Sequence, residues 1–283
     1  MPLAALLLVL GAAVCHSVWN LLVKSDARRL EIQSGALLVG VVLCSPALLI
    51  YPLTAVSPAA WGAVLVSGLF EAGYVFALTA AYGAGDLSLV YPVARGTPPL
   101  LVVPLAIVLL GERPAWQGLV GIGLVVLGIA AGHGGFPGGP AWVNRRALAL
   151  ALLTGVFTAG YSLVNKLGVA LIPVPLYALL VFAVDATLIS LARWLHGGLA
   201  GTRVRDAPWG RTIVVGVLMM AAYLAVLAAM AQAPVSYVVA AREVSVVVAA
   251  ILGALVLRER HPAGRIAGAA VIFAGLVLIA LAR

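Results

Sequence analysis

The sequence predicts an all-α membrane protein of ten transmembrane helices, built as two inverted five-helix repeats. Three observations support this prediction: the composition, ten apolar segments of membrane-spanning length, and a likeness between the two halves. Of the 283 residues, 64% are hydrophobic and only 9% are charged, with a mean hydropathy of +1.17. Soluble domains carry about 25% charged residues, so lipid must be the solvent for most of this chain.

Ten apolar segments follow one another, and each is close to the ~20 residues that a spanning helix needs. They cover residues 3–23, 34–54, 61–82, 88–110, 115–132, 146–165, 174–195, 212–232, 235–257 and 263–281. The first segment lacks the basic region and the cleavage site of a signal peptide, so we expect it to remain as the first helix. Most connections are short, but those at 132–146 and 196–211 are longer and polar, and the first falls at the midpoint of the chain.

The two halves of the chain resemble each other in order and spacing. The matching stretches are HSVWNLLVK (16–24) with TAGYSLVNK (158–166), YVFALTAA (74–81) with YLAVLAAM (223–230), and LLGERP (109–114) with VLRERH (256–261). We therefore divide the chain into a first repeat at 1–132, a linker at 133–144 and a second repeat at 145–283. Because five is an odd number of crossings, the second repeat must enter the membrane from the opposite side, a recurring plan among secondary transporters.

The basic residues lie mostly in the short gaps between apolar segments. This is the membrane pattern, so the net charge of +8 does not indicate a nucleic-acid binder. The side opposite the chain termini receives Lys24, Arg28, Arg29, Arg145, Arg146, Arg193, Arg203, Arg205, Arg211, Arg258, Arg260 and Arg265. The side of the termini receives Arg113, Lys166 and Arg283. By the positive-inside rule, this asymmetry predicts that both termini lie outside the cytoplasm.

Arg95 stands among prolines in the apolar stretch SLVYPVARGTPPLLVVP at 88–104. An arginine at the centre of a spanning helix costs roughly 2.5–3.5 kcal/mol on insertion scales, and each proline removes a backbone donor. Non-helical backbone at membrane depth persists only where it is buried in protein or lines water. We therefore expect a broken helix in which Arg95 faces a cavity. The alternatives are an arginine that snorkels to the surface or one that forms a buried ion pair with Glu71.

Further charged residues lie at membrane depth in other segments. Glu71 shares one helical face with Ser67 and Tyr74, where a carboxylate and a phenol could bind a cation or an ammonium group. Arg242 and Glu243 are adjacent, so their side chains diverge by about 100° and must find partners elsewhere.

The first segment of each repeat carries aromatic and polar side chains in similar places, such as Trp19 and Tyr161, which could wall a central site. Lys24 and Lys166 are typical of interfacial anchors.

Asp185 is a lone acid within its segment, and a packing role and a proton-relay role are both open. The candidate substrate-binding residues are Trp19, Asn20, Glu71, Tyr74, Tyr82, Tyr91, Arg95, Tyr161, Tyr223, Arg242 and Glu243.

Motifs for enzymes, cofactors and metals point away from catalysis. GAGD at 83–86 matches the short G-x-G-D signature of intramembrane aspartyl proteases, but the preceding segment lacks the partner aspartate that this chemistry requires. The sequence has no H-E-x-x-H motif, P-loop or dinucleotide fingerprint, and Cys15 and Cys44 predict neither a metal site nor a disulfide. We expect no enzyme, cofactor or metal, and we expect the glycine-rich stretches at 118–132 and 264–275 to form scaffold or a dimer contact.

The ten segments, the inverted halves and the paired GERP and RERH signals resemble the drug/metabolite transporter superfamily, and most closely its EamA-type members. Glu112 and Glu259 match the characteristic glutamate of that signal. Within the superfamily, the chain resembles bacterial amino-acid exporters, including the aromatic amino-acid exporters. The resemblance implies a ten-helix bundle in which segments 1, 3, 4, 6, 8 and 9 line a central substrate cavity. It also implies termini in the cytoplasm, against the charge count, so the orientation stays open.

We therefore expect a multi-pass secondary transporter of the bacterial inner membrane that exports amino acids, including aromatic or apolar ones, or related small metabolites by alternating access. Arg95 or Arg242 would bind the substrate carboxylate, and Glu71 or Glu243 its ammonium group. The expected partners are membrane lipid, the small-molecule substrate and H⁺ as coupling ion, without nucleic acid, in a monomer or homodimer. The alternatives are a transporter of cationic drugs, nucleotide sugars or phosphorylated metabolites and, in another class, a membrane scaffold or lipid-modifying enzyme.

Overall fold

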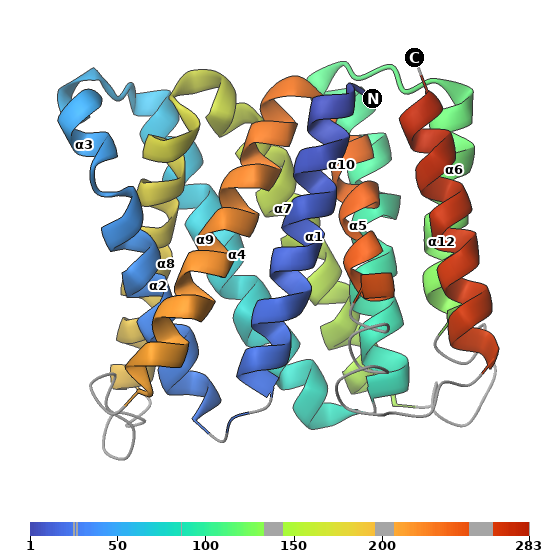
Figure 1. The fold of residues 1–283 in the computed structure, drawn as a ribbon, viewed down its shortest axis with the longest axis horizontal. Coiled ribbons are helices and arrows are strands. Elements are labelled where there is room, and N and C mark those ends of the chain that lie inside the picture. Colours follow the sequence, from blue (N-terminus) through green and yellow to red (C-terminus); the bar gives the residue numbers. More distant parts are fainter. Residues whose placement is uncertain are drawn as a thin grey trace.

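The computed structural model describes residues 1–24, 26, 28–85, 87–132, 144–195, 207–248 and 263–282. Within these ranges every regular element is helical (Figure 1). The helices are α1 (Leu3–Lys24), α2 (Arg29–Cys44), α3 (Ala47–Ile50), the 3-10 helix η1 (Leu53–Ala55), α4 (Pro58–Ala84), α5 (Leu87–Leu110), α6 (Trp116–Gly132), α7 (Arg145–Leu171), α8 (Val174–Leu195), α9 (Trp209–Gln232), α10 (Val235–Arg242) and α12 (Ala263–Leu281). Residues 244–248 are also helical.

The helices run alternately up and down, and both termini lie at the same end of the bundle (Figure 1). In the described part of the chain, seven helices are long and apolar enough to cross a membrane, and two shorter apolar helices lie at Trp116–Ala131 and Ala267–Leu281. With α2 and α3 counted as one crossing, and α10 with the helical residues that follow it as another, the bundle has ten crossings. The predicted all-α fold of ten helices in two repeats is confirmed.

The second crossing differs from its predicted range of 34–54. Its main helix begins earlier, at Arg29, and ends at Cys44, where a turn at Ser45 and Pro46 precedes the short helix α3. Proline has no backbone N–H and a fixed φ, so it favours an interruption at this point. The Ser45 hydroxyl donates to the carbonyl oxygen of Val42 at 2.8 Å, which satisfies one of the acceptors left at the helix end.

Local capping residues explain where other helices begin. The Ser57 side chain accepts a hydrogen bond from the N–H of Ala60 at 3.2 Å, with Pro58 at the first helical position of α4. The Asn144 side chain accepts from the N–H of Ala147 at 3.1 Å and starts α7 in the same way. Both helices consequently begin before the predicted apolar ranges, and both also continue past the ends of those ranges.

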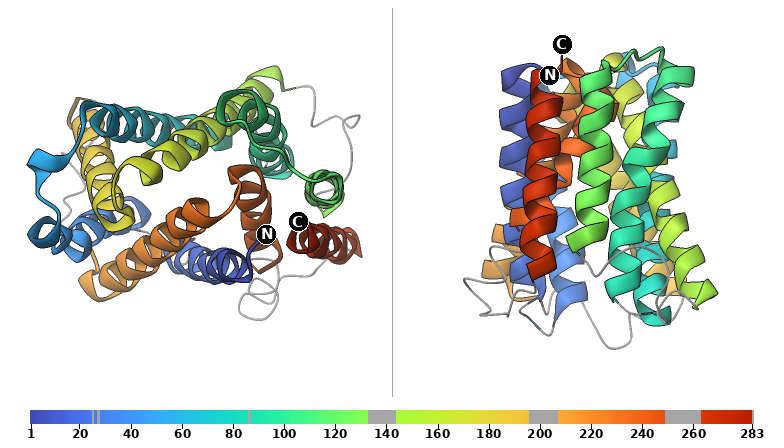
Figure 2. Two further views of the ribbon diagram at one scale, coloured as in Figure 1. Left: turned by 90° about the horizontal axis from the view of Figure 1, so that it is seen from above. Right: turned by 90° about the vertical axis from the view of Figure 1, so that its right-hand side faces the viewer.

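The contacts between helices follow the inverted repeat. In the second half, α7 packs against α4 and α5 of the first half. In the corresponding arrangement, α1 packs against α9 and α10 (Figure 2, left). Each half therefore places its first helix against the third and fourth crossings of the other half. The polar side chains of those six crossings are thereby brought toward one interior.

The last helices of the two repeats, α6 and α12, pack against each other along one lateral edge of the bundle (Figure 2). A Cβ atom at Gly121 would meet the carbonyl oxygen of Gly275 at 2.6 Å, and one at Gly128 would meet the carbonyl oxygen of Gly268 at 2.7 Å. Glycine at these positions lets the two backbones approach closely, as in other membrane helix pairs. The glycine-rich stretches thus form a contact within the chain, in keeping with the predicted scaffold role.

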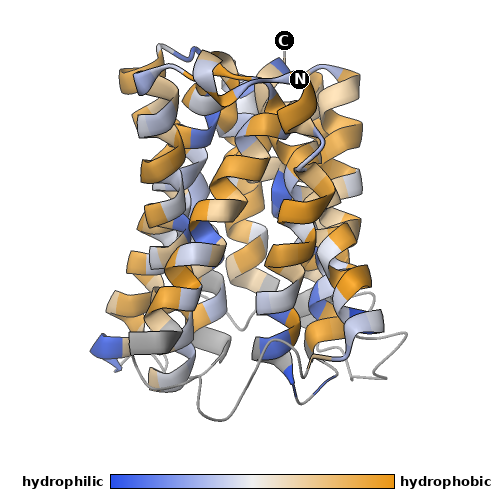
Figure 3. Ribbon diagram, turned by 90° about the vertical axis from the view of Figure 1, so that its left-hand side faces the viewer, coloured by the Kyte–Doolittle hydropathy of each residue, from blue (hydrophilic) through white to orange (hydrophobic). Residues whose placement is uncertain are grey.

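The outer surface of the bundle is apolar and its interior holds polar side chains. Large hydrophobic residues are exposed along the helices, for example Leu49 at 89% and Val108 at 79%. Figure 3 shows hydrophobic positions over most of each helix. Ser67, Asn165 and Asp185 are nevertheless buried. This arrangement suits lipid outside the bundle and a polar site within it.

Candidate functional site

Arg95 lies on α5 at the centre of one polar group, which we call the arginine cluster. Its guanidinium Nη1 lies 3.8 Å from Oε1 of Glu243, and its Nη2 lies 3.2 Å from Nε2 of His16. The ring of Tyr91, one turn earlier on α5, has its centroid 5.7 Å from the guanidinium carbon. The cluster therefore joins α1, α5 and the end of α10. The Arg95 side chain remains 23% exposed, whereas that of Glu243 is 5% exposed.

The backbone around this cluster differs from the expectation for α5. The predicted break at the prolines is wrong, because α5 is one continuous helix from Leu87 to Leu110. Pro98 and Pro99 remove two backbone donors without ending the helix, and neighbouring helices make such prolines tolerable in membranes. The hydroxyl of Thr97 donates to the carbonyl oxygen of Val93 at 2.6 Å and adds a bond to the same turn.

The interruption occurs instead in the second repeat, at the other charged residues. Helix α10 ends at Arg242, Glu243 forms a turn, and helical backbone resumes at 244–248. The N–H of Glu243 bonds to the carbonyl of Ala240, one residue closer than in an α-helix. The Ser17 hydroxyl of α1 lies 3.0 Å from the carbonyl oxygen of Ser245, just after the turn. Among the described residues, the break at membrane depth therefore lies in the ninth crossing and not at the prolines of α5.

Glu71 lies at the centre of a second polar group, which we call the glutamate cluster. Its members are Ser67, Glu71, Asn165, Tyr177, Asp185 and Tyr223. Oε1 of Glu71 accepts from the hydroxyl of Tyr223 at 2.8 Å and lies 3.4 Å from Nδ2 of Asn165. Helices α4, α7, α8 and α9 all contribute, so the cluster joins the third crossing of the first repeat to the second repeat.

Asn165 holds the glutamate cluster together. Its Oδ1 accepts from the hydroxyl of Ser67 at 2.6 Å and from that of Tyr177 at 2.9 Å. Its Nδ2 lies 3.3 Å from the hydroxyl oxygen of Tyr223 as well as close to Glu71. With both ends of the amide occupied, the orientation of the Asn165 side chain is fixed.

Asp185 on α8 lies within hydrogen-bonding reach of Glu71. The residue is only 6% exposed, and its Oδ1 atom has no hydrogen-bond partner among the residues that the structure describes. Helix α8 approaches α4 closely at Gly68, where a Cβ atom would meet Cβ of Val184 at 2.9 Å. Asp185, the lone acid of its predicted segment, therefore has the carboxyl group of Glu71 as its neighbour.

The rings of Tyr74 and Tyr161 lie near charged groups of both clusters. They form an edge-to-face pair with centroids 6.1 Å apart and an interplanar angle of 83°. Tyr161 is within electrostatic range of Glu71, Arg95 and Arg242. The interior thus holds acidic and basic groups with aromatic rings near both.

The structure separates two residues that the sequence allowed as a pair. The ion pair of Arg95 is with Glu243 and does not involve Glu71, whose contacts are with Tyr223, Asn165 and Ser67. The inference that Arg242 and Glu243 must look to other helices is confirmed for Glu243. Among the described residues, no hydrogen bond or ion pair engages Arg242.

Three further sequence candidates, Asn20, Tyr82 and Trp19, belong to neither cluster. Asn20 is exposed and its side chain donates to the carbonyl of His16, one turn earlier in its own helix, at 2.7 Å. Tyr82 is 42% exposed near the end of α4. Trp19 packs edge-on against the ring of His16, and its buried Nε1 atom has no hydrogen-bond partner within the described ranges.

Sequence reasoning left five residues of the clusters out of its candidate set: His16, Ser67, Asn165, Tyr177 and Asp185. Asp185 could have been included, because an ionisable residue in the middle of a spanning segment is a functional candidate by default. Asn165 and His16 stood in the matched first segments of the repeats. Ser67 shared the face of Glu71, whereas nothing in the local pattern of Tyr177 distinguished it.

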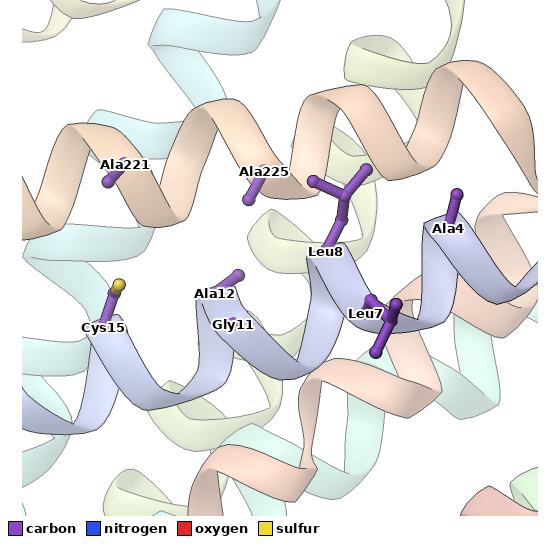
Figure 4. Close-up of a pocket in the computed structure, with 8 residues that line it drawn as sticks. All are labelled: Ala4, Leu7, Leu8, Gly11, Ala12, Cys15, Ala221 and Ala225. Carbon is purple, nitrogen blue, oxygen red and sulfur yellow. The ribbon is translucent and has the colours of Figure 1, made fainter.

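An apolar groove of about 470 Å³ lies apart from both clusters, between α1 and α9 (Figure 4). It is lined by Ala4, Leu7, Leu8, Gly11, Ala12, Cys15, Ala221 and Ala225. Leu7 is 59% exposed, so the groove lies on the outer face of this helix pair. Apart from the weakly polar thiol of Cys15, its lining has no polar side chain with which to orient a polar substrate.

Comparison with known proteins gives a family match in both halves of the chain. A family model described as "EamA-like transporter family" matches residues 3–131 and again residues 145–281. No curated protein matches the sequence. A solved structure described as "Crystal structure of protein" is similar with a TM-score of 0.78 and 19% sequence identity, covering 99% of this chain and 98% of the other. At that identity the structural likeness concerns the fold alone.

Proposed function

Because the chain belongs to the EamA-like transporter family of the drug/metabolite transporter superfamily, we propose that it exports amino acids or related small zwitterionic metabolites by alternating access. One observation carries this proposal: groups of opposite charge, Glu71 and Arg242, lie within electrostatic range of each other inside the bundle, and the Tyr161 ring, paired with that of Tyr74, lies within range of both. A zwitterion needs both kinds of group within the length of one small molecule.

Arg242 is the better partner for the substrate carboxylate. Arg95 already has Glu243 and His16 as neighbours, whereas Arg242 has no such partner in the described part of the chain. An arginine at membrane depth without a partner is costly, and a bidentate carboxylate is the ligand that best satisfies a guanidinium. Arg95 then holds α1, α5 and the broken ninth crossing together.

Glu71 is the better partner for the substrate ammonium group. It keeps part of its surface accessible, and the contacts that it makes leave its charge without a cationic partner in hydrogen-bonding range among the described residues. The rings of Tyr74 and Tyr161 next to it suit an apolar or aromatic substrate side chain. The direction of transport and the membrane are proposed from the family resemblance: export across a bacterial inner membrane.

Alternating access would use the pseudo-symmetry of the contacts. The two clusters join helices of different repeats, so a rocking motion of one repeat against the other would change both. Among the described residues, the break at membrane depth is the turn at Glu243, which makes this turn a suitable hinge. The continuous helix α5 would move as a rigid element.

Counterflow in proteoliposomes tests this proposal. Liposomes that contain the purified protein are loaded with unlabelled amino acids. Uptake is then measured for a labelled panel of aromatic, apolar and cationic compounds and phosphorylated metabolites. We expect exchange of aromatic or apolar amino acids, and a strong loss of it in Arg242→Gln. Arg113→Gln, which removes an exposed arginine outside the bundle interior, is the matched control and should exchange like the wild type.

The same panel separates the alternatives. Exchange of cationic compounds alone, unaffected by Arg242→Gln, would replace the amino-acid proposal with a cation transporter that relies on Glu71. Preference for phosphorylated metabolites would indicate that both arginines bind the cargo. No exchange of any compound by the folded wild-type protein would contradict the proposal.

A further inference from the structure

Two carboxyl groups of different repeats meet inside the bundle, Glu71 on α4 and Asp185 on α8. Helices α4 and α8 pack directly against each other. Two carboxylates within hydrogen-bonding reach of each other in a low-dielectric interior disfavour ionisation of both, so such a pair holds one proton between them. We propose that the Glu71–Asp185 pair is the proton site of the transporter, and that substrate binding releases its proton.

The surroundings of the two groups differ in a way that decides where the proton resides. Oε1 of Glu71 has the hydroxyl of Tyr223 at 2.8 Å and the amide of Asn165 at 3.4 Å as donors. These donors stabilise a carboxylate. Asp185 is 6% exposed, and its Oδ1 atom lacks a donor within the described residues. A buried carboxylate oxygen without a donor is far more costly than the carbonyl oxygen of a neutral acid.

The favoured state is therefore a neutral Asp185 whose hydroxyl donates to an ionised Glu71. In this state the proton bridges the first and second repeats. The other groups that face Glu71 are the phenols of Tyr223 on α9, Tyr161 on α7 and Tyr177 on α8, and the guanidinium of Arg242 on α10. Arg242 supplies the positive charge that balances the remaining negative charge of the pair.

Substrate binding changes this balance. The inference rests on the proposed function, in which an ammonium group binds at Glu71 and a carboxylate at Arg242. As its carboxylate pairs with Arg242, its ammonium group binds Glu71 and displaces the hydroxyl of Asp185 from it. The O–H bond of Asp185 breaks, and the proton passes to water on the side to which the site is open. The ammonium charge offsets the negative charge that Asp185 gains, so the pair with its ligand keeps its net charge. Because the substrate carboxylate neutralises Arg242, the site as a whole becomes more negative by one charge when the proton leaves.

This exchange makes the two ligands compete for one site, which is the condition for antiport. When the Glu71–Asp185 pair holds its proton, the transporter without substrate can open its site to the other side of the membrane. A bundle with substrate bound can move without the proton. An inward proton gradient then drives substrate outward.

Reconstituted full-length protein with a pH-sensitive dye inside the liposomes tests the inference. Two signals are read in parallel: exchange of labelled amino acid for unlabelled amino acid, and proton movement on addition of the amino acid. We expect the wild type to show both. Asp185→Asn keeps the shape of the side chain but cannot release the proton, so it should retain exchange and lose both amino-acid-driven proton movement and uptake driven by a pH gradient. Glu31→Gln removes a buried carboxyl group at the start of α2 and should keep both signals.

Glu71→Gln is the second variant. We expect it to lose proton movement and also to weaken exchange, because Glu71 binds substrate as well as the proton. Asp185→Asn with wild-type proton movement would overturn the inference while leaving the proposed function intact. A folded Asp185→Asn protein that loses exchange as well would also overturn it, since the residue would then be needed for structure or binding. Absence of exchange in the wild type would instead be the failure of the proposed function.

Discussion

Glu112 shows at the scale of one residue how the repeats are joined. Its Oε1 accepts from the N–H of Val235 at 2.5 Å, and its Oε2 accepts from the Ser236 hydroxyl at 2.6 Å. The first N–H groups of a helix lack partners and carry partial positive charge, so a carboxylate from the loop after α5 caps α10 across the repeat boundary. The characteristic glutamate of the sequence signal thus has a structural role here. Its counterpart Glu259 lies outside the described residues.

Asp26, between α1 and α2, is a residue whose effect depends on pH. The backbone N–H of Arg28 lowers the pKa of its carboxyl group, helped by the charges of Arg28 and Arg211. Arg211 Nη1 lies 3.0 Å from Oδ2 of Asp26, which ties this connection to the start of α9. A lowered pKa in the folded state means that the carboxylate stabilises the fold above its unfolded pKa. That stabilisation disappears as the pH falls through the folded value.

We therefore predict that Asp26→Asn lowers the unfolding midpoint at neutral pH, and that its difference from the wild type vanishes well below about pH 4. Thermal unfolding in detergent across pH 3–8, with both proteins in parallel, measures this difference. The reverse trend, in which the variant falls further behind the wild type in acid, would contradict the assignment.

At the scale of the element, close approach of backbones determines which helices pair. The α6–α12 contact depends on glycine, because side-chain atoms at Gly121, Gly128 and Gly275 would fall on the carbonyl oxygens or amide nitrogens of the facing helix. In lipid there is little hydrophobic gain from bringing helices together, so van der Waals contact between backbones contributes much of the association. Prolines predicted the position of the helix break less well, because α5 remains helical through its prolines and the break occurs in the ninth crossing.

We predict that Gly121→Ala destabilises the protein by roughly 1–3 kcal/mol, because the added Cβ would lie 2.6 Å from the carbonyl oxygen of Gly275 and force the helices apart. Gly123→Ala in the same helix is the control, since nothing lies within 4 Å of its Cβ position. That control should be neutral or stabilising by up to about 1 kcal/mol. Unfolding in detergent measures both, and equal stability of the two variants would refute the packing argument.

At the scale of the whole molecule, the direction of the helices assigns the charges to the two membrane faces. The described helix ends place Arg145 and Arg146 at the end opposite the termini, and place Arg113 at the end of the termini (Figure 1). Among the described residues, the excess of basic residues lies at the former end. The charge distribution therefore favours termini outside the cytoplasm.

This orientation can be measured with single cysteines in a background that lacks Cys15 and Cys44. We predict that Arg113→Cys reacts with a membrane-impermeant maleimide in intact cells, whereas Arg146→Cys reacts only after the membrane is opened. The opposite pattern would place both termini in the cytoplasm, as the family resemblance implies, and would show that the loop charges do not set the orientation here.

The sequence by itself determined the number of crossings, their order and the inverted repeat. These properties follow from the length and apolarity of segments such as 61–82, because a bilayer selects for them before any helix meets another. Only the tertiary structure decided that Arg95 pairs with Glu243 and that Asp185 meets Glu71. A helix that is apolar on nearly every side carries little information about its rotation around its own axis, so the partners of its few polar residues are fixed only when the neighbouring helices pack.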